Sequence, residues 1–219
     1  MPDIFESVFD IFYLLFAILT GVFMLVNAQG RILPQLGGAL ALVLGLGDAF
    51  HLLPRVRRAL FGYGKYTKKA MGAGIFVSSI TMTVFYILLY YFWTHEFCVY
   101  AKSLSPVFPV LIWGSAALRI VVCFFPENHW LSGKENKRFS LYRNLPFLVT
   151  GICEIILFLM TGNSDGNGMG RMAGAIIVSF ACYIPVTLYA KKYPMVGMLM
   201  IPKTCAYICM IALIRGAAF

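Results

Sequence analysis

The chain has 219 residues, of which 60% are hydrophobic and only 12% are charged. A soluble domain carries about 25% charged residues, so this composition excludes a soluble globular protein and indicates an integral membrane protein. The formal net charge of +9 does not indicate a nucleic-acid-binding protein, because the basic residues follow a membrane topology.

Seven apolar segments are long enough for membrane-spanning helices, which need about 20 residues each. They lie at roughly 8–26, 33–53, 71–93, 105–125, 144–162, 170–190 and 195–213. We therefore predict an all-α, polytopic bundle of seven transmembrane helices, forming a single transmembrane domain over residues 1–219. Acidic Asp3 and Glu6 precede the first segment, which has no small-residue cleavage site, so we expect it to be a helix rather than a signal peptide.

Basic residues gather in alternate connections between these segments. Twelve of them follow the second, fourth and sixth segments: Arg55, Arg57, Arg58, Lys65, Lys68, Lys69, Lys134, Lys137, Arg138, Arg143, Lys191 and Lys192. The opposite side has four, namely Arg31, Lys102, Arg171 and Arg215. The positive-inside rule then places the N-terminus in the cytoplasm and the C-terminus outside. We expect a multi-pass protein of the cell membrane, whose basic side meets anionic lipid headgroups.

The second segment carries an acid within an apolar and glycine-rich stretch, Gly45-Leu-Gly-Asp48-Ala-Phe-His51. An ionisable group at the centre of a membrane helix costs roughly 2.5–3.5 kcal/mol on insertion scales, so such groups generally have a function or a partner. Asp48, His51 and Arg55 also share one helix face, because residues three and four apart are neighbours. This face is the strongest candidate for a functional site.

Four charged residues inside the predicted spans suggest two buried ion pairs. At 1.5 Å of rise per residue, Asp48 and Arg119 lie roughly 7 and 9 Å from the cytoplasmic ends of their predicted helices. Glu154 and Lys203 lie about 15 and 12 Å deep. Because buried ions need partners, we expect Asp48 to pair with Arg119 and Glu154 with Lys203. Most other polar side chains of the spans fall in the same half, which predicts a polar cavity facing the cytoplasm.

Prolines and glycines suggest where helices bend and pack. Pro185 and Pro202 lie inside the sixth and seventh spans, where a proline removes a helix hydrogen bond, so we expect a break at each. Pro202 would place that break beside Lys203. Gly170 and Gly174 form a small-x-x-x-small pattern, which is typical of close helix packing within a chain or in a homodimer.

Several roles are open for Asp48 and His51. The four candidate roles are a general acid/base pair, a metal site with Glu154 or His129, a proton relay, and a structural unit in which Arg119 neutralises Asp48. No His-x-x-x-His or Cys-x-x-Cys spacing supports a metal, so we expect neither a metal nor a cofactor. Lys203 in the last helix does not indicate retinal, because the third segment lacks carboxylates.

The segment Gly45-Leu-Gly-Asp48-Ala-Phe resembles the Gly-Leu-Gly-Asp-Ala segment of the lysoplasmalogenase (YhhN-like) membrane family. Members of that family have a similar length and cleave a vinyl-ether lysolipid with membrane-embedded acids. The resemblance implies that Asp48 is one of the acids. Glu154 would replace the family's second intramembrane aspartate, because Asp165 lies in an outside loop, and the family has eight helices rather than seven.

Two functions are therefore open. The first is a membrane-embedded hydrolase that acts on a lysolipid or another amphiphile by acid/base catalysis. Its predicted catalytic residues are Asp48, His51 and Glu154, and its predicted substrate-binding residues are Arg119, Lys203, Tyr183, Arg143 and Asn144. The alternative is a small-solute or ion transporter or channel, with a charged site near the midplane of helices five to seven. A receptor-like or scaffold role is a third possibility.

Overall fold

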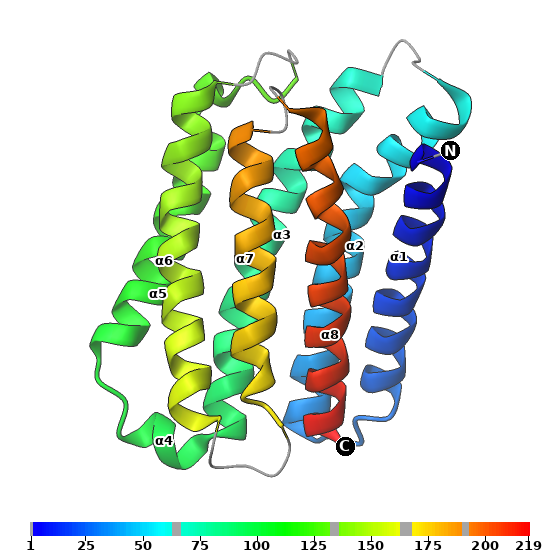
Figure 1. The fold of residues 1–219 in the computed structure, drawn as a ribbon. Helices are drawn as coiled ribbons and strands as arrows, with labels where there is room; N and C mark the ends of the chain where they lie inside the picture. Colours follow the sequence, from blue (N-terminus) through cyan, green and yellow to red (C-terminus); the bar gives the residue numbers. More distant parts are fainter. Residues whose placement is uncertain (1, 63–66, 132–135, 163–167, 190–192) are drawn as a thin grey trace.

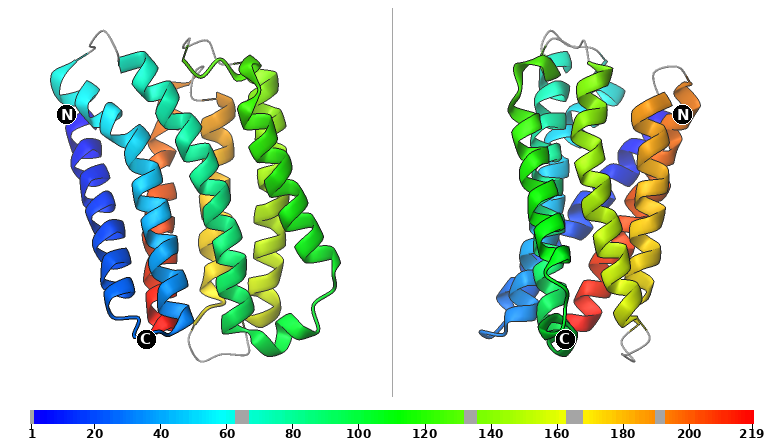
Figure 2. Two further views of the ribbon diagram at one scale, coloured as in Figure 1. Left: turned by 180° about the vertical axis from the view of Figure 1, so that it is seen from behind. Right: turned by 90° about the vertical axis from the view of Figure 1, so that its left-hand side faces the viewer.

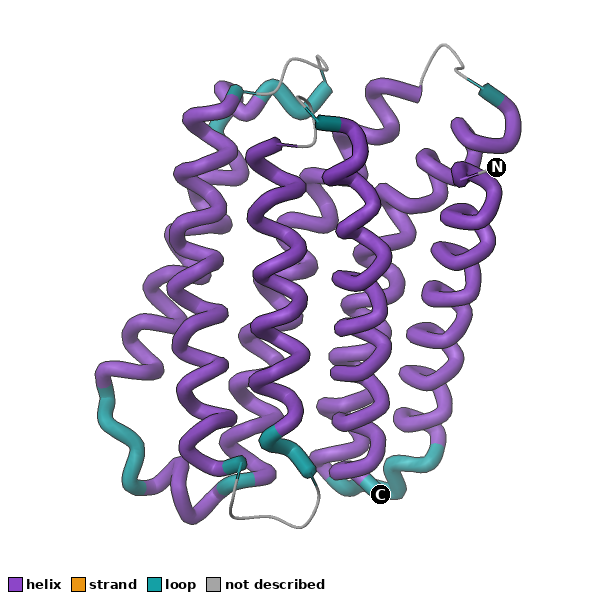
Figure 3. The backbone as a smooth tube through the Cα atoms, in the orientation of Figure 1, coloured by secondary structure: helices purple, strands orange, loops and turns teal. Residues whose placement is uncertain are grey.

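A computed structural model describes residues 2–62, 67–131, 136–162, 168–189 and 193–219, and this part of the chain contains helices and no strands (Figure 3). The helices are α1 (Pro2–Val26), α2 (Ile32–Phe61), α3 (Thr67–Glu96), α4 (Cys98–Lys102), α5 (Val107–Phe124), α6 (Lys137–Thr161), α7 (Arg171–Tyr189) and α8 (Met200–Ala218), with short 3-10 helices η1 (Pro126–Asn128) and η2 (Pro194–Leu199).

Seven segments of the described chain are long and apolar enough to cross a membrane, which confirms the prediction of an all-α polytopic bundle. The chain is an integral membrane protein. Helices α6, α7 and α8 form one layer, α2, α3 and α5 lie behind it, and α1 packs against α2 and α8 at the edge of the bundle (Figure 1). The two termini lie at opposite ends of the bundle. The view from behind shows α3 between α2 and α5 (Figure 2).

We call the end at which α2 ends and α3 begins the basic end, because Arg57, Arg58 and Lys69 lie there. The N-terminus and the beginnings of α6 and α8 are at the same end. Its charge predicts a cytoplasmic location.

Two helices extend further than their hydropathy predicts. Helix α2 continues through Pro54 to Phe61 instead of ending near residue 53, and α6 begins at Lys137 rather than near residue 144. The additional turns carry charged residues, which lower the hydropathy without preventing a helix. Hydropathy therefore marked the apolar part of each helix and not its full length.

The break expected inside the seventh span is instead the start of a helix. Pro202 lies in the first turn of α8, directly after η2. The N–H groups of a first turn have no partner within the helix, so a proline there removes no hydrogen bond. Lys203 consequently lies near the basic end rather than deep in the bundle. Pro185 lies inside α7, but the helix continues through it to Tyr189, so the break expected there is absent.

Glycines allow α2 to pack closely against both of its neighbours. A Cβ atom at Gly45 would lie 3.0 Å from the side chain of Ala17 in α1. A Cβ at Gly47 would overlap Thr81 of α3, and one at Gly74 of α3 would overlap the backbone of α2 at Phe50. This close approach brings side chains of α1 and α3 to the Asp48 position of α2.

The glycine pattern at the start of α7 makes only one close contact. Gly170 packs against Gly162 at the end of α6, whereas no heavy atom lies within 4 Å of a Cβ added at Gly174. The expected close packing within the chain therefore occurs at Gly170, and Gly174 faces outward.

The contact between Gly74 and α2 should be essential for stability. We expect Gly74→Ala to lower the free energy of unfolding by about 1–3 kcal/mol, because the added methyl group would force two backbones apart. Thermal unfolding of the purified protein in detergent measures the change. Gly174→Ala is the matched control and should leave the melting temperature unchanged or raise it. Equal effects of the two substitutions would contradict this account of the packing.

Candidate functional site

Asp48 is held by hydrogen bonds from two neighbouring helices. Its side chain is buried, the hydroxyl of Tyr13 in α1 donates to Oδ2 at 2.9 Å, and the hydroxyl of Ser78 in α3 donates to Oδ1 at 3.0 Å. These bonds are possible because Gly45 and Gly47 let α1 and α3 approach α2. The carboxylate is thus fixed in position by groups of three helices.

His51 lies one turn beyond Asp48, as the spacing predicts. Its Nδ1 atom is 3.9 Å from Oδ1 of Asp48, which is too far for a hydrogen bond. The same nitrogen is buried and has no hydrogen-bond partner. A small shift of the imidazole ring would create a hydrogen-bonded Asp–His pair.

The first helix adds acidic residues to this face. Glu6 of α1 forms an ion pair with Arg55, the third residue of the predicted α2 face. Asp10 is also buried, and its Oδ2 atom has no hydrogen-bond partner. Asp10 and Tyr13 are not among the site residues predicted from the sequence. Their spacing from Glu6, four and then three residues, places all three on one side of a helix and could have revealed them.

Neither predicted ion pair is present among the described residues, in which no carboxylate oxygen lies within 4.0 Å of Arg119 or Lys203. For Glu154 and Lys203 the predicted depths were wrong because the predicted helix starts were wrong. Glu154 lies about 25 Å along α6 from its first residue, whereas Lys203 lies only about 5 Å into α8. Asp48 and Arg119 contact different helices, because Asp48 accepts hydrogen bonds from α1 and α3 and Arg119 stacks on Phe147 of α6.

Lys203 rather than Arg119 is the cation near Asp48. Its Nζ atom lies 5.1 Å from the ring centre of Tyr183 and 4.9 Å from that of Tyr207. It is also close enough to Asp48 for electrostatic interaction. We call Asp48, His51, Tyr13, Ser78 and Lys203 the acid group.

We call a second set of polar side chains the arginine group. It consists of Arg119, Asn128, Arg143, Asn144 and Tyr183. Arg143 Nη1 donates to Oδ1 of Asn128 at 3.0 Å. The hydroxyl of Tyr183 donates to Oδ1 of Asn144 at 2.8 Å. Of the five predicted substrate-binding residues, Asn144 and Lys203 contact Tyr183 directly. Arg119 is connected to Tyr183 through Phe147. Arg143 contacts Asn128 and Trp130.

Glu154 lies apart from the acid group. Its side chain is 0% exposed, and neither carboxylate oxygen has a hydrogen-bond partner. Its polar neighbours are Tyr86 and Tyr90 of α3. The structure thus brings Asp48 and His51 together but does not add Glu154 to them. In the described part of the chain, no three His, Cys, Asp or Glu side chains gather in a way that could hold a metal ion.

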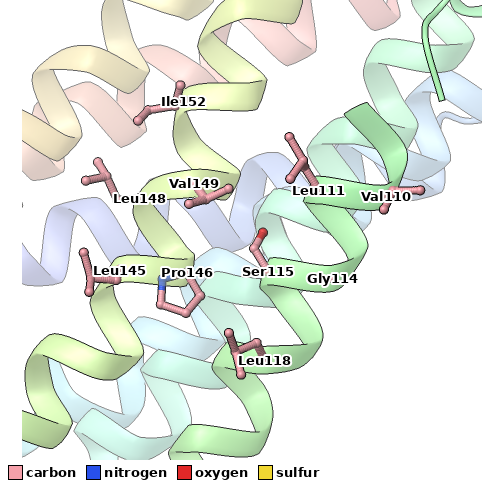
Figure 4. Close-up of a pocket in the computed structure, with 10 residues that line it drawn as sticks. All are labelled: Val110, Leu111, Gly114, Ser115, Leu118, Leu145, Pro146, Leu148, Val149 and Ile152. Carbon is pink, nitrogen blue, oxygen red and sulfur yellow. The ribbon is translucent and has the colours of Figure 1, made fainter. Parts of the chain in front are cut away.

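Grooves on the bundle surface differ in polarity. The groove between α5 and α6 has a volume of about 440 Å³ and an almost entirely apolar lining, from Val110 to Ile152 (Figure 4). Its one hydroxyl side chain, Ser115, is hydrogen-bonded to Thr150. A smaller crevice of about 80 Å³ lies between α6 and α7 and includes Asn144 and Tyr183. This crevice connects the membrane-facing surface with two members of the arginine group, Asn144 and Tyr183.

The hydrogen bond from Tyr13 should stabilise the fold through Asp48. We expect Tyr13→Phe to lower the free energy of unfolding by about 1–3 kcal/mol, since it leaves a buried carboxylate oxygen without that donor. Thermal unfolding in detergent measures the effect. Tyr86→Phe is a matched control, because Tyr86 is equally buried and its hydroxyl has no hydrogen-bond partner. A larger loss with Tyr86→Phe would contradict the prediction.

Comparison with known proteins gives no family for this chain: no family model matches it, and no curated protein or solved structure is significantly similar to it. Its function must therefore be inferred from the acid and arginine groups themselves.

Proposed function

We propose that this protein is a membrane-embedded hydrolase that acts on a lysolipid or a similar single-chain amphiphile, with Asp48 as the acid and His51 as the base. One observation carries the proposal: a buried carboxylate held by Tyr13 and Ser78 lies beside a buried imidazole nitrogen that has no hydrogen-bond partner. Such a nitrogen is available to accept a proton from water. The charge of the basic end supports access from the cytoplasmic leaflet.

The proposed chemistry suits a vinyl-ether lysolipid. Asp48 acts as the general acid and donates a proton to the alkene carbon that is not bonded to oxygen. Water then attacks the other carbon of the double bond, and His51 accepts the proton released. The resulting hemiacetal breaks its bond to the glycerol oxygen, which gives an aldehyde and an alcohol. His51 returns the proton to that oxygen through water, and the proton released as the aldehyde forms restores Asp48.

A transporter for an ion or a small solute is the second candidate, and Glu154 is the observation that favours it. A buried carboxylate with no partner in the middle of a membrane bundle is typical of proton- or ion-coupled sites. Glu154 is separate from Asp48, so the two candidates depend on different residues.

Purified protein in liposomes should release a water-soluble headgroup from a vinyl-ether lysolipid. We expect Asp48→Asn to abolish release and His51→Ala to lower its rate by about 10²–10⁴-fold, the usual contribution of a general acid or base. The assay measures aldehyde and headgroup formation by mass spectrometry.

Glu127→Gln is the control, because Glu127 is exposed in η1 and lies outside both groups. It should leave turnover unchanged. An ester-linked lysolipid tested in parallel shows whether the vinyl ether is required. Solute uptake that Glu154→Gln abolishes, without any lipid turnover, would overturn the hydrolase and support the transporter.

A further inference from the structure

Arg119 is a buried cation without a counter-ion. Its side chain is 2% exposed, and its Nε and Nη1 atoms have no hydrogen-bond partner. No carboxylate of the described residues lies within 4.0 Å of it. A buried charge is strongly disfavoured unless it is paired and hydrogen-bonded, so the guanidinium needs an anion that the described part of the chain does not supply.

Phe147 fixes the position of this guanidinium. The Arg119 Cζ atom lies 3.5 Å from the ring centre of Phe147, so the cation is stacked on the ring face. Cation–π contact is favourable, but it satisfies none of the N–H groups at the edge of the guanidinium. These groups form a planar fork that matches a phosphate or carboxylate in geometry.

A second cation lies on the other side of Tyr183. Tyr183 packs edge-on against Phe147, with ring centres 5.8 Å apart, and Lys203 lies 5.1 Å from the Tyr183 ring centre. Lys203 therefore lies directly beside Tyr183, whereas Arg119 is connected to Tyr183 through Phe147. Their charges do not neutralise one another, and the potential between them favours an anion.

The crevice between α6 and α7 connects the membrane-facing surface with Tyr183, which packs against Phe147 and lies beside Lys203. Its lining is mostly apolar and includes the half-exposed Leu145 and Leu188. Its polar lining is Asn144, Thr187 and Tyr183, and Tyr183 is hydrogen-bonded to Asn144. An apolar lining with a few polar groups is the pattern expected for a molecule that has a hydrocarbon chain and a polar head.

We propose that Arg119 and Lys203 form a binding site around Tyr183 for the phosphate group of a single-chain amphiphile, whose hydrocarbon chain passes through the α6–α7 crevice into the membrane. This site goes beyond the proposed hydrolase, because a protein that only carries such an amphiphile would use it equally. The fork of Arg119 contacts the phosphate oxygens, and Lys203 adds charge from the side of Asp48.

Binding is tested with the full chain in a non-ionic maltoside detergent, using dodecyl phosphate as the probe. Inorganic phosphate tests for a site that needs no chain, and dodecanol tests for a site that needs no charge. Microscale thermophoresis gives the dissociation constants, and thermal unfolding shows stabilisation on binding. We expect dodecyl phosphate to raise the melting temperature and to bind at least tenfold more tightly than either control ligand.

Substitutions then locate the site. We expect Arg119→Gln to weaken dodecyl phosphate binding at least tenfold, and Arg138→Gln, which removes an exposed cation at the same end, to leave it unchanged. Ile184→Trp should weaken binding by filling the crevice, and it keeps the proposal testable if Arg119→Gln does not fold. Equal binding of inorganic phosphate or dodecanol by the wild-type protein overturns the proposal, as does unchanged binding by Arg119→Gln or, if that variant does not fold, by Ile184→Trp.

Discussion

A carboxylate inside a membrane bundle needs hydrogen-bond donors from the protein, and this requirement explains how α1, α2 and α3 are arranged. Asp48 obtains its two donors from α1 and α3. They reach it because glycines at positions 45, 47 and 74 remove the side chains that would hold the helices apart. The glycine-rich composition of α2 and the acid that it carries are therefore one structural feature. The same packing buries the Nδ1 atom of His51 and brings the acidic residues of α1 to the site.

The ionisable groups of the bundle divide into those that are satisfied within the chain and those that are not. Asp48 has hydrogen bonds, and Arg55 has Glu6. Arg119 and Glu154 are buried without such partners. Structural requirements explain the first kind well, because each partner stabilises the other. The second kind is disfavoured in the structure as it stands, so these residues are the ones for which binding or proton transfer offers the better explanation.

Helix ends account for most of the differences between the prediction from sequence and the structure. The predicted spans were those of the most apolar residues, whereas α2 and α6 continue through charged turns at the basic end. Depths counted from the predicted ends therefore made Glu154 level with Lys203. Arg119 packs on Phe147 of α6, and Lys203 is the cation that interacts electrostatically with Asp48. The sequence placed these charged residues inside the spans, but it did not give their partners.

The sequence by itself determined the all-helical, seven-span architecture and the Asp48–His51 face. The length of an apolar segment and the spacing of residues on one helix face are local properties of the sequence. They are therefore the same however the helices pack. Which charges meet was decided only by tertiary structure. The tilt and length of each helix and the close glycine contacts set these distances, and they depend on residues far apart in the chain. For that reason the role of Tyr13 and the isolation of Arg119 became visible only in the folded protein.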